Sequence, residues 1–495
     1  MVHVVWLKRD LRLHDHKPLV EALRYGEPIL PLYVAEPSIW QGGDLSERHF
    51  HFVKESLSDL QHSYDERGGN LFVAIGEMED MLNILEDAFG DFTIHVHEEY
   101  GTEQTRNRNV RVSRWMEEKG LSFIEYPSLG IQQDTKKSFR QNWSAYMKEE
   151  QLPVPERIHT VEEEDVPSIL SSKVDKLNRL SPSGTRIKYG QQGGESLALD
   201  DLQTFLEERC SRYETDLSNP LASFNTCSRL SAYLAWGNIS MRHVVQRTNA
   251  AMTEDGNHTK QLKAFRSRLY WHGQCMKQLM EYPSLPTSSV QKELDAVRKE
   301  WEEETFERWC KGETGIPMID AAMRSLLKTG WLNARSRAML VSFICNTLLM
   351  DWRRPAHYLA QQFLDYEPAI HYSEMQRLAG TFGEAEARIY NPIQEGKKHD
   401  PDGAFVRRYV PVLKDVPNKY VHEPWKYDGF FHLHYVEPVV DVKNVNKVAK
   451  QVLNKMDGRS RRAKGNQHKT ERREKDGTEQ LSFGLLEGSD EEEQS

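Results

Sequence analysis

From Val2 to about Tyr126 the chain alternates short apolar runs with stretches of helical periodicity. The apolar runs are rich in β-branched and aromatic residues: HVVWL (3–7), ILPLYV (29–34), LFVAIG (71–76), FTIHVH (92–97) and LSFIEY (121–126). Nearly continuous apolar strands separated by helices predict a Rossmann-like, five-stranded parallel sheet covered on both faces. A ligand is then expected at the carboxyl ends of the strands, although no GxGxxG follows the first one.

The pattern changes further along the chain. Residues 131–197 are rich in Pro, Ser, Gly and charge, which is typical of a surface linker between domains. Residues 198–440 are almost entirely helical in period, and residues 441–495 are first basic and then acidic, as disordered tails often are. We therefore predict an α/β domain over 1–130, a linker, an all-helical domain and a charged, disordered tail.

Composition narrows the class of protein. The 495 residues are 38% hydrophobic and 28% charged, with a mean hydropathy of −0.69, which predicts a multi-domain cytoplasmic protein. No run approaches the ~20 apolar residues of a spanning helix, so no membrane partner is expected. The formal net charge of −10 argues against a protein that coats nucleic acid everywhere but allows a local basic face. Nothing indicates an obligate oligomer, and we expect a monomer.

The five cysteines are scattered and form no CxxC pair. Neither a zinc ribbon nor a disulfide ladder fits their spacing, and an iron–sulfur cluster would need four at another spacing. We expect reduced, mostly buried thiols and no metal.

Residues 225–240, NTCSRLSAYLAWGNIS, form the strongest local signal. Small hydroxyl and thiol residues lead into a helix there, and exposed backbone N–H groups beside hydroxyls suit a diphosphate. Taken alone, the same pattern also describes an ordinary helix-capping sequence.

Three longer segments occur in a set order: GIPMIDAAMRSLLKTGWLNARSRAMLVSF, LLMDWRRPAHYLAQQFLDYEP and RIYNPIQEGKKHDPDGAFVRRYVP, all within 315–411. Together with residues 225–240 and the N-terminal VVWLKRDLRLHDHKPLVEAL, they resemble the photolyase/cryptochrome family, over roughly residues 2–440. The resemblance implies a photolyase-type antenna domain, a helical FAD-binding domain and light-driven flavin chemistry of the bacterial photolyase type.

The resemblance also implies the FAD contacts. Arg337 is expected to pair with Asp365 beside the isoalloxazine ring, where an arginine stabilises the anionic reduced flavin. His371 stands where repair enzymes carry an Asn facing the flavin N5, and we expect it to titrate near neutral pH. Cys227 replaces a usual Thr. The full set of expected FAD contacts is Tyr213, Cys227, Ser228, Leu230, Ser231, Arg337, Asp365, Glu367 and His371.

By the same resemblance Trp271 lines a substrate cavity, where its ring can stack on a flipped pyrimidine lesion. Arg335 and Arg337 are two residues apart and hence on different helix faces, which leaves Arg335 for a DNA phosphate. Arg268, also an expected DNA contact, replaces a Glu that bonds the lesion in repair enzymes, and Ala334 replaces an Asn. Trp271, His371, Arg337 and Asp365 are the expected catalytic residues.

The electron path departs from the family pattern. Trp352 and Trp301 match the middle and outer members of a tryptophan chain that leads from flavin to surface. Met375 occupies the inner position, and Arg377 replaces another Trp. A thioether does not readily give an electron to an excited flavin, so the path is broken or rerouted. The possible substitutes are Tyr366, Tyr372 and Trp331, and a purely structural role for Trp352 stays open.

Three functions remain open at this stage. The first is an FAD-dependent, blue-light-driven photolyase that transfers an electron from reduced flavin to a flipped pyrimidine lesion in DNA. The second is a cryptochrome-type photoreceptor without repair activity, and the third is a nucleotide-binding protein without photochemistry. Glu98, Glu99 and Tyr100 resemble a loop near the family's antenna pocket, so a second antenna chromophore of unknown identity is left open.

Overall fold

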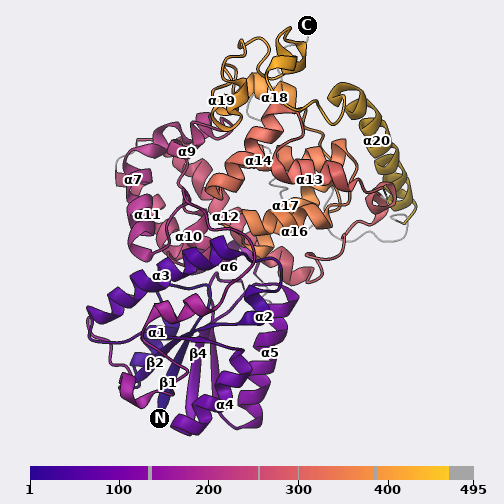
Figure 1. Ribbon diagram of the computed structural model, residues 1–495. Helices are drawn as coiled ribbons and strands as arrows, with labels where there is room; N and C mark the ends of the chain where they lie inside the picture. Colours follow the sequence, from indigo (N-terminus) through magenta and orange to yellow (C-terminus); the bar gives the residue numbers. More distant parts are fainter. Residues whose placement is uncertain (132–136, 255–256, 299, 383–386, 468–495) are drawn as a thin grey trace.

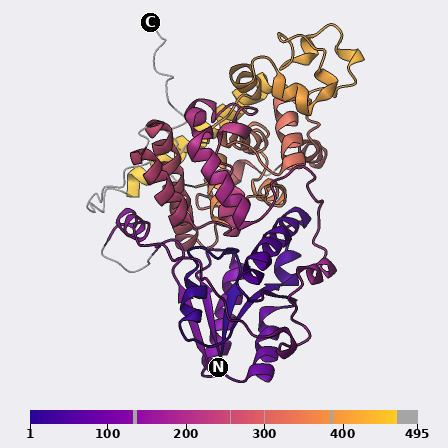
Figure 2. The ribbon, with the colours of Figure 1, turned by 90° about the vertical axis from the view of Figure 1, so that its left-hand side faces the viewer.

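The computed structural model describes residues 1–131, 137–254, 257–298, 300–382 and 387–467. A sheet domain lies at the lower end of Figure 1, and a larger helical domain lies above it. Figure 2 shows the same two layers after a quarter turn, with the first residues at the far end from the helical domain.

The predicted parallel sheet is confirmed. Its strands are β1 (Val2–Leu7), β2 (Ile29–Ala35), β3 (Phe72–Ile75), β4 (Phe92–His97) and β5 (Ser122–Tyr126), all parallel in the order β3-β2-β1-β4-β5. The helices of this domain are α1 (Lys17–Leu23), α2 (Pro37–Trp40), α3 (Glu47–Asp65), α4 (Met78–Phe89) and α5 (Glu103–Glu118). Val5 and Leu7 point into one apolar core and Val4 and Trp6 into another, because successive side chains of a strand face opposite ways. Burial on both faces explains the continuous apolar runs.

The described residues of the segment 131–197, expected as a surface linker, pack on both domains, with the helix at 139–146 against α12 (Thr259–Glu281) and the later part on the sheet domain. The segment contains α6 (Phe139–Tyr146), and its backbone pairs with two strands. The Ile29 N–H donates to the His159 carbonyl at 3.0 Å, and the Val73 N–H to the Ser171 carbonyl at 2.8 Å. The second bond covers the free edge of β3, which would otherwise expose unpaired backbone groups.

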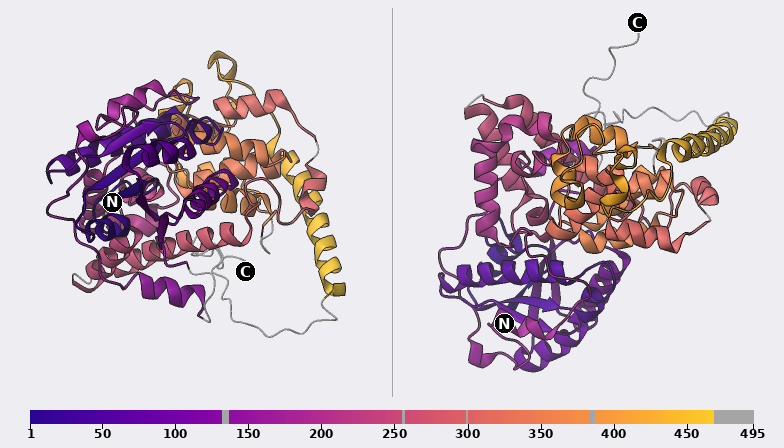
Figure 3. Two further views of the ribbon diagram at one scale, coloured as in Figure 1. Left: turned by 90° about the horizontal axis from the view of Figure 1, so that it is seen from below. Right: turned by 45° about the horizontal axis from the view of Figure 1, so that its top comes forward.

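The helical domain runs from α7 onward and supports the all-helical prediction. Its helices are α7 (Glu195–Glu207), α8 (Tyr213–Asp216), α9 (Ser223–Thr226), α10 (Ser231–Trp236), α11 (Met241–Glu254), α12 (Thr259–Glu281), α13 (Glu303–Lys311), α14 (Pro317–Thr329), α15 (Ala334–Ser342), α16 (Arg353–Gln362), α17 (Pro368–Ala379), α18 (Pro392–His399), α19 (Ala404–Tyr409) and α20 (Val442–Gln467). In its centre α17 packs against both α12 and α15. Figure 3 shows this domain from below and from a tilted view.

Helix α20 lies in the segment 441–495, which was predicted to be disordered. Val442, Ala449 and Leu453 are buried, and their spacing places them on one face of the helix. The Thr347 hydroxyl donates to the Asn446 side chain at 2.7 Å, which fixes the helix to the domain. The acidic end of the predicted tail lies outside the described residues. Among the helices of the described ranges, none is long and apolar enough to cross a membrane.

The loop after β1 joins the two domains. Arg9 Nη1 donates to the carbonyls of Ala235 (3.1 Å) and Tyr366 (2.9 Å), and its guanidinium lies 4.3 Å from the ring centroid of Trp236. Gly237 has φ +70°, and a Cβ at this position would lie 2.1 Å from the Arg9 carbonyl oxygen. Only glycine therefore fits where α10 ends against this loop.

Candidate functional site

A cavity of about 290 Å³ lies within the helical domain, enclosed by α8, α10, α12, α15 and α17 together with the loops that precede them. All nine residues expected to contact FAD line it, and so do two of the residues expected to contact DNA. These residues are Tyr213, Cys227, Ser228, Leu230, Ser231, Arg268, Trp271, Arg337, Asp365, Glu367 and His371. Met375 and Ala334, two further positions that depart from the family pattern, line the same cavity.

The turn before α10 presents an unusual arginine to this cavity. Arg229 has φ 64°, a left-handed conformation that costs a non-glycine residue of order 1 kcal/mol or more. Its Nη1 is buried without a hydrogen-bond partner, and burial lowers the pKa of the guanidinium to about 10. An unpartnered buried cation fits the diphosphate of FAD, since a bound anion would complete its bonding. Helix α10 spans only Ser231–Trp236, so side chains must supply most of this attraction.

Arg337 and Asp365 meet on one wall of the cavity. Arg337 Nη2 lies 2.6 Å from Asp365 Oδ2, and Arg337 Nε donates to the Leu332 carbonyl at 2.9 Å. Burial alone would raise the pKa of Asp365, but the charge and hydrogen bond of Arg337 outweigh it and hold the pKa below its usual range. Asn333 positions the arginine, because its side chain caps α15 by accepting the Ser336 N–H at 3.2 Å. The pair therefore carries both charges at neutral pH.

His371 and Glu367 have pKa values shifted in opposite directions. His371 Nε2–H donates to the Ala356 carbonyl at 2.8 Å, which leaves Nδ1 unprotonated in the neutral ring. Burial lowers the pKa of His371 to about 4, so the expectation that it titrates near neutral pH was wrong. Burial raises the pKa of Glu367 to about 7, although Arg9 lies 3.8 Å away. The group that titrates near neutral pH in this cavity is thus Glu367.

Cationic groups gather near Trp271. The guanidinium of Arg377 lies 6.0 Å from its ring centroid, and Arg268 lines the cavity from the same helix as Trp271. Burial raises the pKa of Glu374, which lies 3.3 Å from Arg377. Positive charge beside an aromatic face suits an anionic, base-bearing ligand such as a nucleotide.

Three predicted residues lie outside the cavity lining. Arg335 points away from Arg337, with its Nε 3.7 Å from Glu395, as expected for the opposite helix face. The Trp352 indole N–H donates to the Ser289 hydroxyl at 2.8 Å deep in the core. Trp301 lies nearer the surface, with the guanidinium of Arg354 4.3 Å from its ring centroid.

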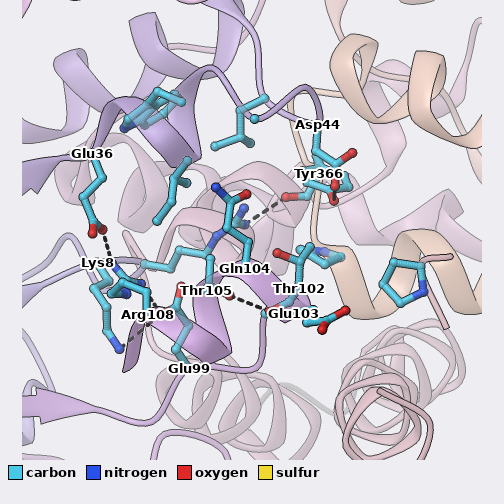
Figure 4. A pocket seen from close by; sticks show the side chains of 18 of the residues that line it. Lys8, Glu36, Asp44, Glu99, Thr102, Glu103, Gln104, Thr105, Arg108 and Tyr366 are labelled. Atoms are coloured by element: carbon cyan, nitrogen blue, oxygen red, sulfur yellow. Dashed lines mark hydrogen bonds and ion pairs between the residues drawn. The ribbon is translucent and has the colours of Figure 1, made fainter. Parts of the chain in front are cut away.

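A second pocket of about 470 Å³ lies between the two domains, and local motifs did not predict its extent (Figure 4). One wall carries buried ion pairs: Glu99 lies 2.7 Å from Arg108 and 3.2 Å from Lys8, and Arg108 also pairs with Glu36. Burial favours a raised pKa at Glu99, but Lys8 and Arg108 outweigh it and lower the pKa to about 2. The pocket follows the carboxyl ends of β1, β2 and β4, which the sheet prediction indicated, and Glu99, from the loop expected near an antenna pocket, lines it.

Asp10, His16 and His97 form a buried cluster whose side-chain atoms lie within 4.8 Å of one another. The Leu19 N–H donates to His16 Nδ1 at 3.2 Å, so the proton of the neutral ring sits on Nε2 and points to Asp10 at 3.1 Å. His97 Nδ1 lies 2.8 Å from the same carboxylate. Asp10 thus pairs with both imidazoles, and His16 anchors the start of α1.

An α/β domain joined to a helical domain with a cavity suited to a flavin nucleotide defines a two-domain flavoprotein. Residues 3–147 match the family model for DNA photolyase, and residues 265–455 match that for the FAD binding domain of DNA photolyase. The deoxyribodipyrimidine photo-lyase of Escherichia coli is 30% identical over 462 residues, which cover 89% of this chain and 96% of that one.

Two solved structures share the architecture. A class III photolyase from Agrobacterium tumefaciens has a TM-score of 0.80 at 26% identity, covering 92% of this chain and 98% of that one. An archaeal photolyase from Sulfolobus tokodaii with two FAD molecules has a TM-score of 0.76 at 27% identity, covering 91% and 99%. The chain belongs to the photolyase/cryptochrome family, and it carries the family's FAD-binding domain.

Proposed function

We propose that this protein is an FAD-dependent, blue-light-driven DNA photolyase that acts on a flipped pyrimidine lesion. The observation that carries the proposal is the cavity itself. It combines the Arg337–Asp365 ion pair, the unpartnered Arg229 cation and the Trp271 ring, in a chain that aligns with photolyases over most of its length. When bound, reduced FAD supplies the absorption of blue light and the electron.

Different residues of the cavity would bind different parts of FAD. Arg229, Ser228 and Ser231 would hold the diphosphate, and Arg337 with Asp365 would orient the ring system and balance its charge. The enclosing walls exclude water, which strengthens these electrostatic contacts.

DNA would meet the cavity at its Trp271 side. Trp271 offers a face on which an extruded base can stack, Arg335 is the expected phosphate contact, and Arg268 is a further expected DNA contact. We propose that the protein acts on DNA as a monomer.

Repair of damaged DNA tests the proposal directly. FAD in the purified protein is reduced chemically, and oligonucleotides carrying a cyclobutane dimer or a (6-4) product are then illuminated with blue light. Light-dependent loss of either lesion, absent in the dark and weakened by Trp271→Ala, is the expected result. Intact lesions with FAD bound and photoactive would overturn it.

A cryptochrome-type photoreceptor is the second candidate, and the cavity lining favours it at two positions. Arg268 and Ala334 stand where the family's repair enzymes are expected to carry a Glu and an Asn for the lesion. A receptor would show no repair but a light-dependent change in its surface. Limited proteolysis in light and darkness, on the FAD-loaded protein, separates the two candidates.

We further propose that the interdomain pocket holds a second, light-harvesting chromophore. Its volume of about 470 Å³ is within the range of small-molecule sites, and its ion pairs are already balanced, so the ligand need not be charged. The absorption spectrum of the protein purified under dim light tests this, since FAD alone would contradict it.

A further inference from the structure

Asp44 gathers hydrogen bonds from three side chains of the helical domain. The carboxylate accepts the Tyr366 hydroxyl at 2.6 Å and the Tyr372 hydroxyl at 3.0 Å, and His357 Nδ1 lies 2.9 Å away. Asp44 itself comes from the loop before α3 in the sheet domain, and Figure 4 shows it beside Tyr366 at the edge of the interdomain pocket. Two buried phenols thus share one proton acceptor.

The two tyrosines lie one ring away from the FAD cavity. His371 lines that cavity, and its ring centroid is 5.3 Å from that of Tyr366 and 5.1 Å from that of Tyr372. Both tyrosines also line the interdomain pocket. The tyrosine pair, Tyr366 and Tyr372, therefore links the FAD cavity to a carboxylate, and the carboxylate to His357, whose side chain is 50% exposed.

Trp331 and Trp352 are less suited to give up an electron here. Trp331 lines the cavity, but the guanidinium of Arg229 lies 4.0 Å from its ring centroid, and a cation over the ring opposes formation of a second positive charge. Trp352 donates its N–H to the Ser289 hydroxyl rather than to a carboxylate, and Met375 occupies the cavity wall. Neither indole has an ionised acceptor for its proton in these contacts.

The protonation states suit transfer of a proton from phenol to carboxylate. Burial raises the pKa of Tyr366 and of Tyr372, so both stay protonated. Burial would also raise the pKa of Asp44, but the hydrogen bonds from His357 and Tyr366 outweigh it and lower the pKa. At neutral pH the unit is therefore two phenols and one carboxylate.

We propose that the tyrosine pair and Asp44 form a redox-active unit that supplies electrons to the FAD cavity in light. One electron leaves a phenol ring for the light-excited, oxidised isoalloxazine, while the hydroxyl proton passes along the existing hydrogen bond to Asp44. A neutral tyrosyl radical and a carboxylic acid result.

An external thiol then restores the phenol by giving it one hydrogen atom, and the thiol's sulfur radical is the oxidised product. Asp44, whose side chain is 25% exposed, returns to the carboxylate by releasing its proton to water. The proposal rests on the proposed function only in requiring FAD in the cavity, and it does not require DNA repair.

Photoreduction of the FAD-loaded protein tests the proposal. Oxidised protein is illuminated with blue light in the presence of dithiothreitol, and the loss of flavin absorption is followed. The double variant Tyr366→Phe/Tyr372→Phe is expected to slow this roughly tenfold or more, and each single variant less. Electron paramagnetic resonance of samples frozen under light should show a tyrosyl signal that the double variant lacks.

Asp44→Asn separates proton transfer from packing, because it keeps both rings and removes the acceptor. Slower photoreduction and a smaller rate difference between H2O and D2O are expected. Tyr358→Phe is the matched control, since this partly buried phenol on α16 donates to the Cys310 carbonyl at 2.7 Å and not to a carboxylate. FAD content and the melting temperature show that each variant is folded.

Two outcomes would overturn the proposal: an unchanged rate in the folded double variant, or a tryptophan radical as the light-induced signal. Repair with chemically reduced FAD distinguishes this failure from that of the proposed function. The double variant should keep that repair activity, whereas a wild-type protein that reduces its FAD but repairs nothing contradicts the proposed function alone.

Discussion

The two large cavities of this protein differ in how their charges are balanced. In the interdomain pocket, Glu99 lies 3.2 Å from Lys8 and 2.7 Å from Arg108, so these charges have an opposite charge beside them, although Lys8 Nζ and Arg108 Nε make no hydrogen bond with a described residue. In the FAD cavity, Arg337 has Asp365, but Nη1 of Arg229 is buried with no partner. A cavity with an unpartnered cation depends on an anionic ligand, while one with paired charges tolerates being empty. The difference predicts that FAD is part of the stable fold and that a second chromophore is dispensable.

The largest expected effect comes from Arg337→Ala. The change leaves the buried carboxylate of Asp365 without its partner, and we expect a loss of about 3–5 kcal/mol in the free energy of unfolding together with low FAD occupancy. The ratio of flavin to protein absorbance after purification and a denaturant titration measure both. Arg335→Ala is the matched control two residues away, outside the cavity. Full occupancy in Arg337→Ala would contradict the role assigned to the pair.

Arg108→Met probes the other cavity. Glu99 keeps Lys8 as a partner, and Glu36 can take up a proton because burial already raises its pKa to about 7. We therefore expect a smaller loss, about 2–3 kcal/mol, with FAD content unchanged. Thermal unfolding and the flavin spectrum measure the two quantities separately. A loss of FAD in this variant would show that the two cavities are coupled, and the contrast drawn between them would then be wrong.

Glu367 makes the stability of the FAD cavity depend on pH. Its pKa in the folded protein is raised to about 7, so its contribution is fully present below the unfolded value of 4.5 and is lost as pH rises through about 7. Relative to Glu367→Gln, the wild type should lose about 3 kcal/mol of stability between pH 5 and pH 8. If the free energy of unfolding changed with pH in the same way in both proteins, the role of Glu367 would be ruled out.

The smallest expected effect is on rate rather than stability. Met375→Trp places an oxidisable ring in the cavity wall and should speed reduction of FAD by an external thiol under blue light. Bleaching of the flavin absorption band measures this rate. If it does not change, the interruption at Met375 is not what limits electron supply.

The sequence predicted those elements whose signal lies within a short stretch of neighbouring residues. Five strand runs and the segment 225–240 each carry their signal within a few residues, but the FAD contacts were expected only because such segments resemble the photolyase/cryptochrome family. Tyr366 and Tyr372 were named as possible electron donors, but their shared partner Asp44 was not predicted, because it lies 328 positions from Tyr372 and no periodicity links the two. The packing of segment 131–197 was not predicted for another reason. Its polar composition is typical of a linker, but its backbone pairs with β2 and β3.

The junction at Arg9 and Gly237 has a consequence for how the chain is made. During synthesis the sheet domain emerges first, yet Arg9 must wait for the carbonyls of residues 235 and 366 before its guanidinium is satisfied. Until then the carboxyl ends of the strands, where the interdomain pocket lies, stay exposed to water and to other chains. The helical domain thus acts as a lid built into the same polypeptide, and a fragment ending near residue 200 should bind the separately produced remainder.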